Sequence, residues 1–236
     1  MKIGIFTDLH ANLPALEICV NRFKELECDI IVHVGDLIGI GPYPKECMEL
    51  ATSVKNMEFV MGNHDHWYGY GLPHPIPEYM NSEEVDHHRW THAQIGDQYK
   101  DVVKSWKFSV ALRIGDFCFN FRHYGLNKEK NWFKQHIKDP TINELDQLFG
   151  DVESDIIFYG HNHEANDQVG RSRYVNLGSA GCFTSPLARI GILSHNDDSY
   201  ELQKEELEFD DRDLFSAFNA RKVPARDFIR KVFFRR

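Results

Sequence analysis

The chain has 236 residues, of which 42% are hydrophobic and 13% aromatic, so it is long enough to bury one sizeable core. Its formal net charge is −9, which disfavours tight, sequence-independent binding to long nucleic acids. The five cysteines are odd in number and form no C-x-x-C pair, which indicates reduced thiols in a cytoplasmic protein. The chain begins with a strand-like run, and we find neither a leader peptide nor an apolar run of membrane-spanning length.

Short apolar runs and helical patterns alternate in the first sixty residues. Strands are expected at 3–6, 30–34 and 58–61. Between them, apolar residues recur at helical spacing over 12–26, where Asn12 is the expected N-cap, and over 44–54. The sequence therefore predicts a βαβαβ unit made of stacked strand and helix layers.

The stretch from about 67 to 107 has a different composition. It begins with Gly, Pro and aromatic residues and continues as a predicted helix over 82–106, with Ser82 as its N-cap. Because this stretch is too short for a core of its own, we interpret it as a cap-like excursion from a single domain that spans 1–236.

The remaining elements are short. A hairpin is expected from the runs 108–114 and 117–123, which are joined across Gly115-Asp116. A helix over 141–150 follows, then strands at 155–160, 173–177, 189–194 and 199–203, and finally two helices in the tail.

Five of the predicted strands end on polar side chains that metals prefer. These side chains are Asp8 and His10, Asp36, Asn63, His123, and His161 with His163. Ligands of open α/β sheets bind beyond the carboxyl ends of the strands. Burying such groups together costs several kcal/mol unless they form a complete hydrogen-bond network or hold cations. Nitrogen and oxygen donors without cysteine suit first-row divalent ions, whereas calcium prefers more carboxylates.

The motifs that carry these residues resemble those of a known family. "DLH", "GDLIGIG", "GNHDH", "RHYG" and "GHNH", in this order, are similar to the motifs of the calcineurin-like metallophosphoesterase superfamily, and most similar to its small bacterial and archaeal phosphoesterase branch. The loop "NLGSAG" (176–181) and the C-terminal tail resemble it too. The resemblance implies an α/β (α+β) fold, a four-layer αββα sandwich in which two mixed β-sheets lie face to face between helices.

The resemblance also implies roles for the site residues. Asp8, His10 and His163 would hold one metal ion, Asn63, His123 and His161 the other, and Asp36 would bridge the two. The ions would be Mn, Fe or Zn, although Co and Ni also fit. A hydroxide that bridges the ions would attack the phosphorus of a small phosphodiester, phosphomonoester or nucleotide. His64 would protonate the leaving oxygen, and Asp65 would orient His64.

Two further residues are candidates for substrate binding. Asn12 lies at the start of the first predicted helix, where backbone amides favour a phosphate. His66 follows the "GNHDH" motif closely and is the histidine of the excursion that we favour for the substrate pocket. His33, inside a strand, is interpreted as a core residue.

Two departures from the family pattern narrow the activity. Tyr124 stands between His123 and Gly125, where relatives read His-Gly, so the turn there is expected to differ. No arginine follows the Gly-Asp motif, as it does in the serine/threonine protein phosphatases of the superfamily, and this disfavours protein phosphatase activity.

Two alternatives to a phosphoesterase remain. One is a non-catalytic scaffold, because the superfamily includes a retromer subunit that kept the fold and lost its catalytic histidine. The other is a nuclease, which the charge of −9 and the lack of a basic stripe disfavour. The expected partner is a small phosphorylated substrate, such as a nucleotide. We expect no interaction with a membrane.

Overall fold

In the part of the chain that the structure describes there are ten strands, most of them apolar, and helices connect or cover them. The computed structural model describes residues 1–196 and 199–236. The elements in chain order are β1 (Lys2–Phe6), α1 (Leu13–Glu25), β2 (Ile30–His33), α2 (Pro44–Ser53), β3 (Met57–Phe59), α3 (Asn63–Tyr70), α4 (Ser82–Ile95), α5 (Lys100–Lys104), β4 (Ser109–Ile114), β5 (Phe117–Arg122), α6 (Ile142–Leu148), β6 (Ile156–Tyr159), β7 (Asn166–Val169), β8 (Arg173–Asn176), β9 (Leu187–Asn196), β10 (Ser199–Glu208), α7 (Arg212–Ala220), α8 (Arg226–Ile229) and the π-helix η1 (Arg230–Phe234).

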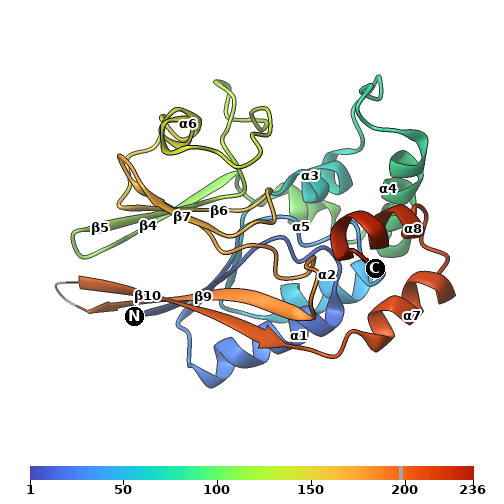
Figure 1. The fold of residues 1–236 in the computed structure, drawn as a ribbon, viewed down its shortest axis with the longest axis horizontal. Helices are drawn as coiled ribbons and strands as arrows, with labels where there is room; N and C mark the ends of the chain where they lie inside the picture. The colour runs from blue at the N-terminus through green and yellow to red at the C-terminus, as the bar shows by residue number, and fades with distance from the viewer. Residues whose placement is uncertain (197–198) are drawn as a thin grey trace.

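The strands form two mixed sheets that lie face to face (Figure 1). The first has the order β10-β9-β1-β2-β3, in which β1, β2 and β3 are parallel and β9 and β10 antiparallel to their neighbours. The second has the order β4-β5-β6-β8-β7, in which β5, β6 and β8 are parallel and the two edge strands antiparallel. With helices outside both sheets, the predicted four-layer α/β sandwich is confirmed.

Alternation along each strand explains the layers. On β6, Ile156 and Phe158 face the apolar core between the sheets, whereas Ile157 and Tyr159 face α6 on the outside. The outer face of the first sheet packs against α1 and α2. Gly4 of β1 is needed there, because a Cβ on it would lie 2.5 Å from the ring of Phe23 on α1.

The segment from 67 to 107 differs in detail from its prediction. Its beginning is helical, since α3 continues to Tyr70. The next helix is capped by Asn81, whose side chain accepts from Glu84 N, and not by Ser82. That helix stops at Gly96, which has a φ of 73°, so α5 is separate. Tyr68, Ile95, Val103 and Trp106 of this segment belong to the same apolar cluster as α1 and α2.

The tail covers the end of the sandwich where α3 and α4 also lie (Figure 1). Leu214 and Phe218 of α7 and Phe234 of η1 pack with Ile40 and Cys182, which lie in loops that follow strands. All five cysteines are free thiols. Across the described residues, no helix is both long and apolar enough to cross a membrane.

Candidate metal centre

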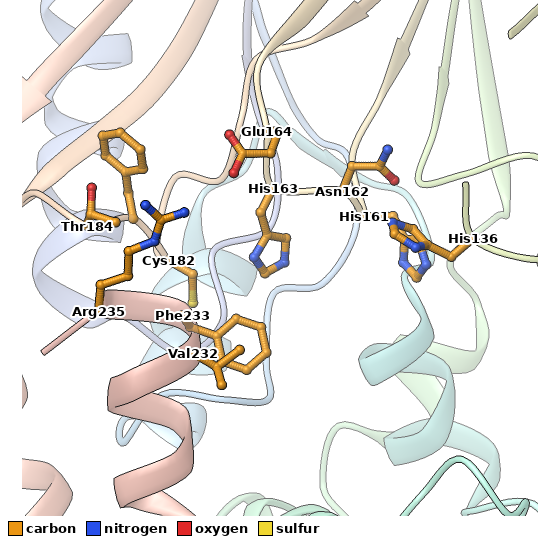
Figure 2. Close-up of a pocket in the computed structure, with 11 residues that line it drawn as sticks. His136, His161, Asn162, His163, Glu164, Cys182, Thr184, Val232, Phe233 and Arg235 are labelled. Carbon is orange, nitrogen blue, oxygen red and sulfur yellow. The ribbon is translucent and has the colours of Figure 1, made fainter. Parts of the chain in front are cut away.

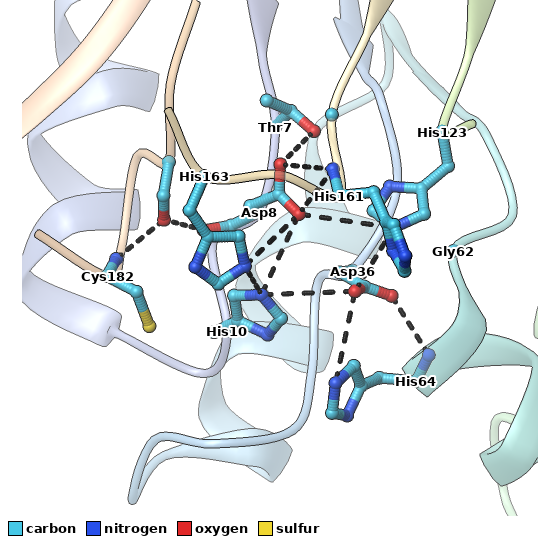
Figure 3. A network of polar contacts seen from close by, with 12 residues as sticks. Thr7, Asp8, His10, Asp36, Gly62, His64, His123, His161, His163 and Cys182 are labelled. Carbon is cyan, nitrogen blue, oxygen red and sulfur yellow. Dashed lines mark hydrogen bonds and ion pairs between the residues drawn. The ribbon is translucent and has the colours of Figure 1, made fainter. Parts of the chain in front are cut away.

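The polar side chains that end five strands gather at one end of the two sheets, and Figure 3 labels all of them except Asn63. Asp8 and His10 follow β1, Asp36 follows β2, Asn63 follows β3, His123 follows β5, and His161 and His163 follow β6. Six of the seven form two compact clusters. In each cluster, the candidate ligand atoms lie within 4.8 Å of one another: Asp8, His10 and His163 in the first, and Asp36, His123 and His161 in the second.

Asn63 completes the second cluster. Its Oδ1 lies 3.2 Å from Nε2 of His123 and 3.0 Å from Nδ1 of His161. The structure therefore brings together all seven side chains that the sequence selects as metal ligands. Their division between two ions stays a prediction.

The two carboxylates connect the clusters. Oδ2 of Asp36 lies 3.2 Å from Nε2 of His123 and 3.9 Å from Nε2 of His10, so it faces one residue of each cluster. Oδ1 of Asp8 does the same, 3.5 Å from Nε2 of His163 and 4.0 Å from Nε2 of His123. Asp36 thus has the placement that a bridging ligand needs, and Asp8 shares part of it.

Tight loops hold the ligands in place. The backbone amides of Asp8 and His10 donate to the carbonyl oxygens of Gly35 and Asp36, which ties the loop after β1 to the loop after β2. Gly160 lets β6 approach β1, because a Cβ on it would lie 2.1 Å from Thr7 Oγ1. The glycine before His161 is therefore a packing requirement of the site.

The "NLGSAG" loop supports Asp8 from behind. The Ser179 hydroxyl donates to the carbonyl oxygen of Asp8 at 2.6 Å. The Thr7 hydroxyl donates to Asp8 Oδ2 at 2.8 Å, and the amide of His161 donates to the same carboxylate at 3.1 Å. Apart from the resemblance of the loop, no motif in the sequence singled out Thr7 or Ser179 as a supporting residue.

Burial shifts the titration of the clusters. It raises the pKa of Asp8, and it lowers the pKa values of His10 and His161 well below the usual range for histidine. Burial also opposes charge on His123, but the nearby carboxylates of Asp36 and Asp8 outweigh it and raise the pKa of His123 to about 9. The neutral rings of His10 and His161 keep the lone pairs that metal coordination requires, whereas a cation would have to displace the proton that the carboxylates stabilise on His123.

The side chains fit a pair of divalent metal ions. Nε2 of His10 lies 2.8 Å from Nε2 of His163. For these two nitrogens to form a hydrogen bond, one must carry a proton and the other must accept it. A cation between them would use both lone pairs. Together with the carboxylates and the Asn63 amide oxygen, this donor set suits first-row divalent metals.

His64 stands beside the two clusters. Its backbone amide donates to Asp36 Oδ1 at 2.9 Å, and its ring Nε2 lies 4.0 Å from Asp36 Oδ2. The ring packs edge-on against His10, with centroids 5.1 Å apart. Nδ1 of His64 is buried and finds no hydrogen-bond partner within the described chain. The ring is therefore near enough to meet a group bound between the clusters.

Asp65 has a different environment from the one that we expected. Its carboxylate accepts from the backbone amides of Asp36 at 2.8 Å, Leu37 at 3.1 Å and Gly62 at 3.1 Å. The side chain is fully buried and points toward the loop that carries Asp36. Asp65 is therefore placed to hold this loop rather than to orient the His64 ring.

The side chains of the two candidate substrate residues are engaged in contacts within the protein. Asn12 is 1% exposed, and its side chain caps α1 by accepting from Ala15 N at 3.2 Å while it donates to the Gly181 carbonyl oxygen at 2.7 Å. His66 packs between Tyr70 and Trp132, with ring centroids at 4.6 Å and 4.9 Å. We therefore leave both residues out of the proposed substrate site.

A pocket of about 400 Å³ opens beside the clusters (Figure 2). His161 and His163 form part of its wall, and Val232, Phe233 and Arg235 from the C-terminal helical segment form another part. Sequence reasoning did not select these three residues, because they lie more than sixty positions after the last ligand and belong to no motif.

Tyr124, the residue that departs from the family pattern, is accommodated next to the site. It is fully buried, its hydroxyl accepts from the amide of Ile137 at 2.8 Å, and its ring centroid lies 4.8 Å from that of His161. His123 still faces Asp36, so the insertion leaves the second cluster assembled.

Comparisons of the sequence agree with this arrangement. The model of the calcineurin-like phosphoesterase superfamily domain matches residues 1–198. The uncharacterized protein MJ0912 of Methanocaldococcus jannaschii is 27% identical over 161 residues, which are 68% of this chain. The match spans 62% of the length of that relative.

Solved structures show the same fold. A hypothetical protein, PH1004 from Pyrococcus horikoshii, superposes with a TM-score of 0.80 at 16% identity, and the match covers 99% of this chain and 98% of that one. A metallophosphoesterase from Sphaerobacter thermophilus superposes with a TM-score of 0.70 at 22% identity, covering 97% of both chains. Because the family model matches residues 1–198, which are most of the chain, the chain belongs to the calcineurin-like phosphoesterase superfamily.

Proposed function

We propose that this protein is a two-metal phosphoesterase that hydrolyses small phosphate esters. Family membership supports a metal-dependent phosphoesterase. The observation that carries the finer proposal is the pair of adjoining ligand clusters, which meet at the carboxylates of Asp8 and Asp36. We place Asp8, His10 and His163 around one ion, Asn63, His123 and His161 around the other, and Asp36 between them.

Two divalent ions in these clusters would supply an activated water and a clamp on the phosphate oxygens. The residues of the chain would do the rest. The buried carboxylates and imidazoles hold their positions through the backbone bonds described above, so little reorganisation is needed when a substrate arrives. The donor set favours Mn, Fe or Zn over calcium.

His64 would act on the leaving oxygen. Burial lowers the pKa of His64 well below its usual value, so the ring is neutral in the free protein. A neutral ring can donate a hydrogen bond to charge that develops on the leaving oxygen. When the anionic ester raises the pKa of the ring, the ring takes up a proton from water, and this protonated ring would then donate its proton to the leaving oxygen.

The substrate that we propose is a small phosphodiester, phosphomonoester or nucleotide in the cytoplasm. A pocket of about 400 Å³ matches ligands of that size. The formal charge of −9 disfavours a nuclease that tracks long polyanions. His64 and all seven candidate ligands are present, and this disfavours the scaffold alternative.

The test is hydrolysis of bis(4-nitrophenyl) phosphate and 4-nitrophenyl phosphate by protein loaded with Mn, alongside metal analysis. We expect about two ions per chain, and we expect chelation to abolish turnover. His64→Ala should keep its metal content and lose about 10²- to 10⁴-fold in kcat. The loss should be larger for an alkyl leaving group, which needs a proton, than for 4-nitrophenoxide.

His74→Ala is the matched control, because His74 is an exposed histidine outside both clusters. It should keep both metal content and turnover. A wild-type protein that binds no transition metal and hydrolyses neither ester would contradict the proposal and favour the scaffold alternative. Unchanged turnover in His64→Ala would remove His64 from the chemistry.

A further inference from the structure

Two pockets flank the candidate metal centre and share one wall. The first, of about 400 Å³, reaches the ligands His161 and His163, and the second, of about 250 Å³, reaches His64. Phe233 of η1 lines both pockets, and its ring centroid lies 5.7 Å from that of His163. A phosphate bound at the centre therefore has one pocket for each side of the ester.

The first pocket contains Arg235, a cation that makes no ion pair with any carboxylate in the described part of the chain. Arg235 lines it, and within residues 1–196 and 199–236 no carboxylate lies within 4.0 Å of its guanidinium. Its neighbour Arg236, by contrast, pairs with Asp211 at 2.6 Å. Figure 2 shows Arg235 reaching from the C-terminal segment toward Thr184, on the side of His163 away from His161. Glu164 also lines this pocket, more than 4.0 Å from the guanidinium.

The second pocket has the opposite character. Ile40, Phe228 and Ile229 give it apolar walls, and Glu83 and Glu84 of α4 supply its charges. A second anion on a substrate would be repelled by these glutamates and attracted by Arg235. An uncharged group would fit beside His64.

We propose that Arg235 binds a second anionic group on the part of the substrate that the phosphate retains, while an uncharged leaving group occupies the pocket of His64. This inference rests on the proposed function and names its substrate class: phosphoesters whose retained substituent carries a further phosphate or carboxylate, such as a nucleotide with two phosphates. Water forms the new P–O bond, the P–O bond to the leaving group breaks, and the leaving oxygen takes a proton. Arg235 is a specificity residue in this scheme, since it contacts the substrate away from the reacting atoms.

The test compares two substrates that share one leaving group. Thymidine 5′-(4-nitrophenyl phosphate) has no second anion, and its 3′-phosphorylated form has one. We expect the wild-type protein to prefer the 3′-phosphorylated form by roughly tenfold in kcat/KM, mainly through KM, the size of effect that a charge-assisted hydrogen bond at a partly exposed site gives. Arg235→Gln should reduce this ratio to about one, and Arg235→Lys should restore part of it.

Lys231→Gln is the matched control. Lys231 is exposed on η1, which ends one residue before Arg235, and it lines neither pocket, so its substitution removes the same charge without touching the proposed contact. It should keep the wild-type ratio. If Lys231→Gln lowers the ratio as much as Arg235→Gln does, the preference comes from net charge alone and the Arg235 contact is wrong.

A binding measurement separates this inference from the proposed function. Titration calorimetry with thymidine 3′,5′-bisphosphate and thymidine 5′-monophosphate should show tighter binding of the bisphosphate by the wild-type protein, and no such difference in Arg235→Gln. If that pattern appears without any hydrolysis, the subsite stands and the phosphoesterase proposal fails. If both esters are hydrolysed equally and both nucleotides bind equally, the phosphoesterase proposal stands and the subsite is overturned.

Discussion

Five of the seven candidate ligands have a backbone conformation that is uncommon for residues other than glycine, although Asp and His adopt it more often than most. Their φ angles are 52° for Asp8, 51° for His10, 59° for Asp36, 70° for His161 and 60° for His163. Each residue in this left-handed region costs on the order of 1–3 kcal/mol, and such strain clusters at functional sites. The side chains could be selected from the sequence because they follow apolar strands, but nothing in the residue types predicted this conformation.

Asp65 shows how a sequence neighbour misleads. Because it follows His64 directly, we expected it to orient the His64 ring. Both residues lie on α3, however, and consecutive residues on a helix point about 100° apart. Its carboxylate therefore reaches the backbone of the Asp36 loop instead.

We predict that Asp65→Ala lowers the free energy of unfolding by about 2–4 kcal/mol, because it leaves several buried amides without an acceptor. Urea unfolding in the presence of a chelator measures this without a contribution from metal release. Asp65→Asn, which keeps one acceptor oxygen, should lose less, and Asp116→Ala, at an exposed hairpin position, should lose little. A stable Asp65→Ala protein that has lost only turnover would return Asp65 to the role of orienting His64.

Among the elements, the strongly periodic ones could be predicted and the short polar ones could not. The runs that became β1, β2, β5 and β6 are apolar because both faces of these strands are buried. The strand β7, by contrast, has the sequence "NDQV" and lies at the edge of its sheet, where its side chains are alternately half-buried and exposed to solvent. The helix α3 was hidden because its eight residues include Gly69 and several aromatics, which resemble a loop by composition.

Asn12 stabilises the start of α1. Asn12 was predicted both to cap the helix and to meet a phosphate, and the structure uses its oxygen and its nitrogen for the cap and for Gly181. We expect Asn12→Ala to destabilise the protein by about 1–2 kcal/mol through loss of the cap and of that hydrogen bond. The measurement is the urea midpoint at constant m-value. If stability is unchanged while KM rises, Asn12 belongs to the substrate site after all.

At the scale of the whole molecule, the pairing of the two sheets lay beyond local patterns. β9 and β10 occur last among the strands, yet β9 pairs with β1 at the start of the chain. Periodicity identifies strands but does not identify their partners, so the sandwich was predicted from the family resemblance alone. The seven ligands were easier to predict, because the ends of parallel strands meet at one edge whichever strands are adjacent.

Buried histidines make the stability of the molecule depend on pH. His33 lies between Phe6 and Phe59, and burial, with a smaller effect of His123, lowers its pKa to about 3. The unfolded chain binds a proton at this residue below a pKa of about 6.5, whereas the folded chain does not. His33 therefore lowers the stability as the pH falls from about 6.5 toward 3, and has no such effect above that range.

We predict that His33→Phe makes the protein less sensitive to acid. Between pH 7 and pH 5, the free energy of unfolding of the wild-type protein should fall by about 2 kcal/mol more than that of the variant, because the variant lacks one titrating group. Urea unfolding at both pH values, with metals chelated, measures the difference. His74→Ala is the comparison at an exposed histidine. Equal pH dependence in wild type and His33→Phe would show that His33 titrates alike in the folded and unfolded chain.

The division of the ligands between the sheets also bears on the order of events during synthesis. The first cluster needs Asp8 and His10 from the first sheet and His163 from the second, and the second cluster needs Asp36 together with His123 and His161. A chain that is still emerging from the ribosome can therefore complete the second cluster only once residue 161 has been made, and the first only once residue 163 has been made. If the clusters hold ions as proposed, ion capture would come late in biogenesis, and it would add to the apolar contacts and to the hydrogen bonds from His161 and Ser179 to Asp8 that already join the two layers.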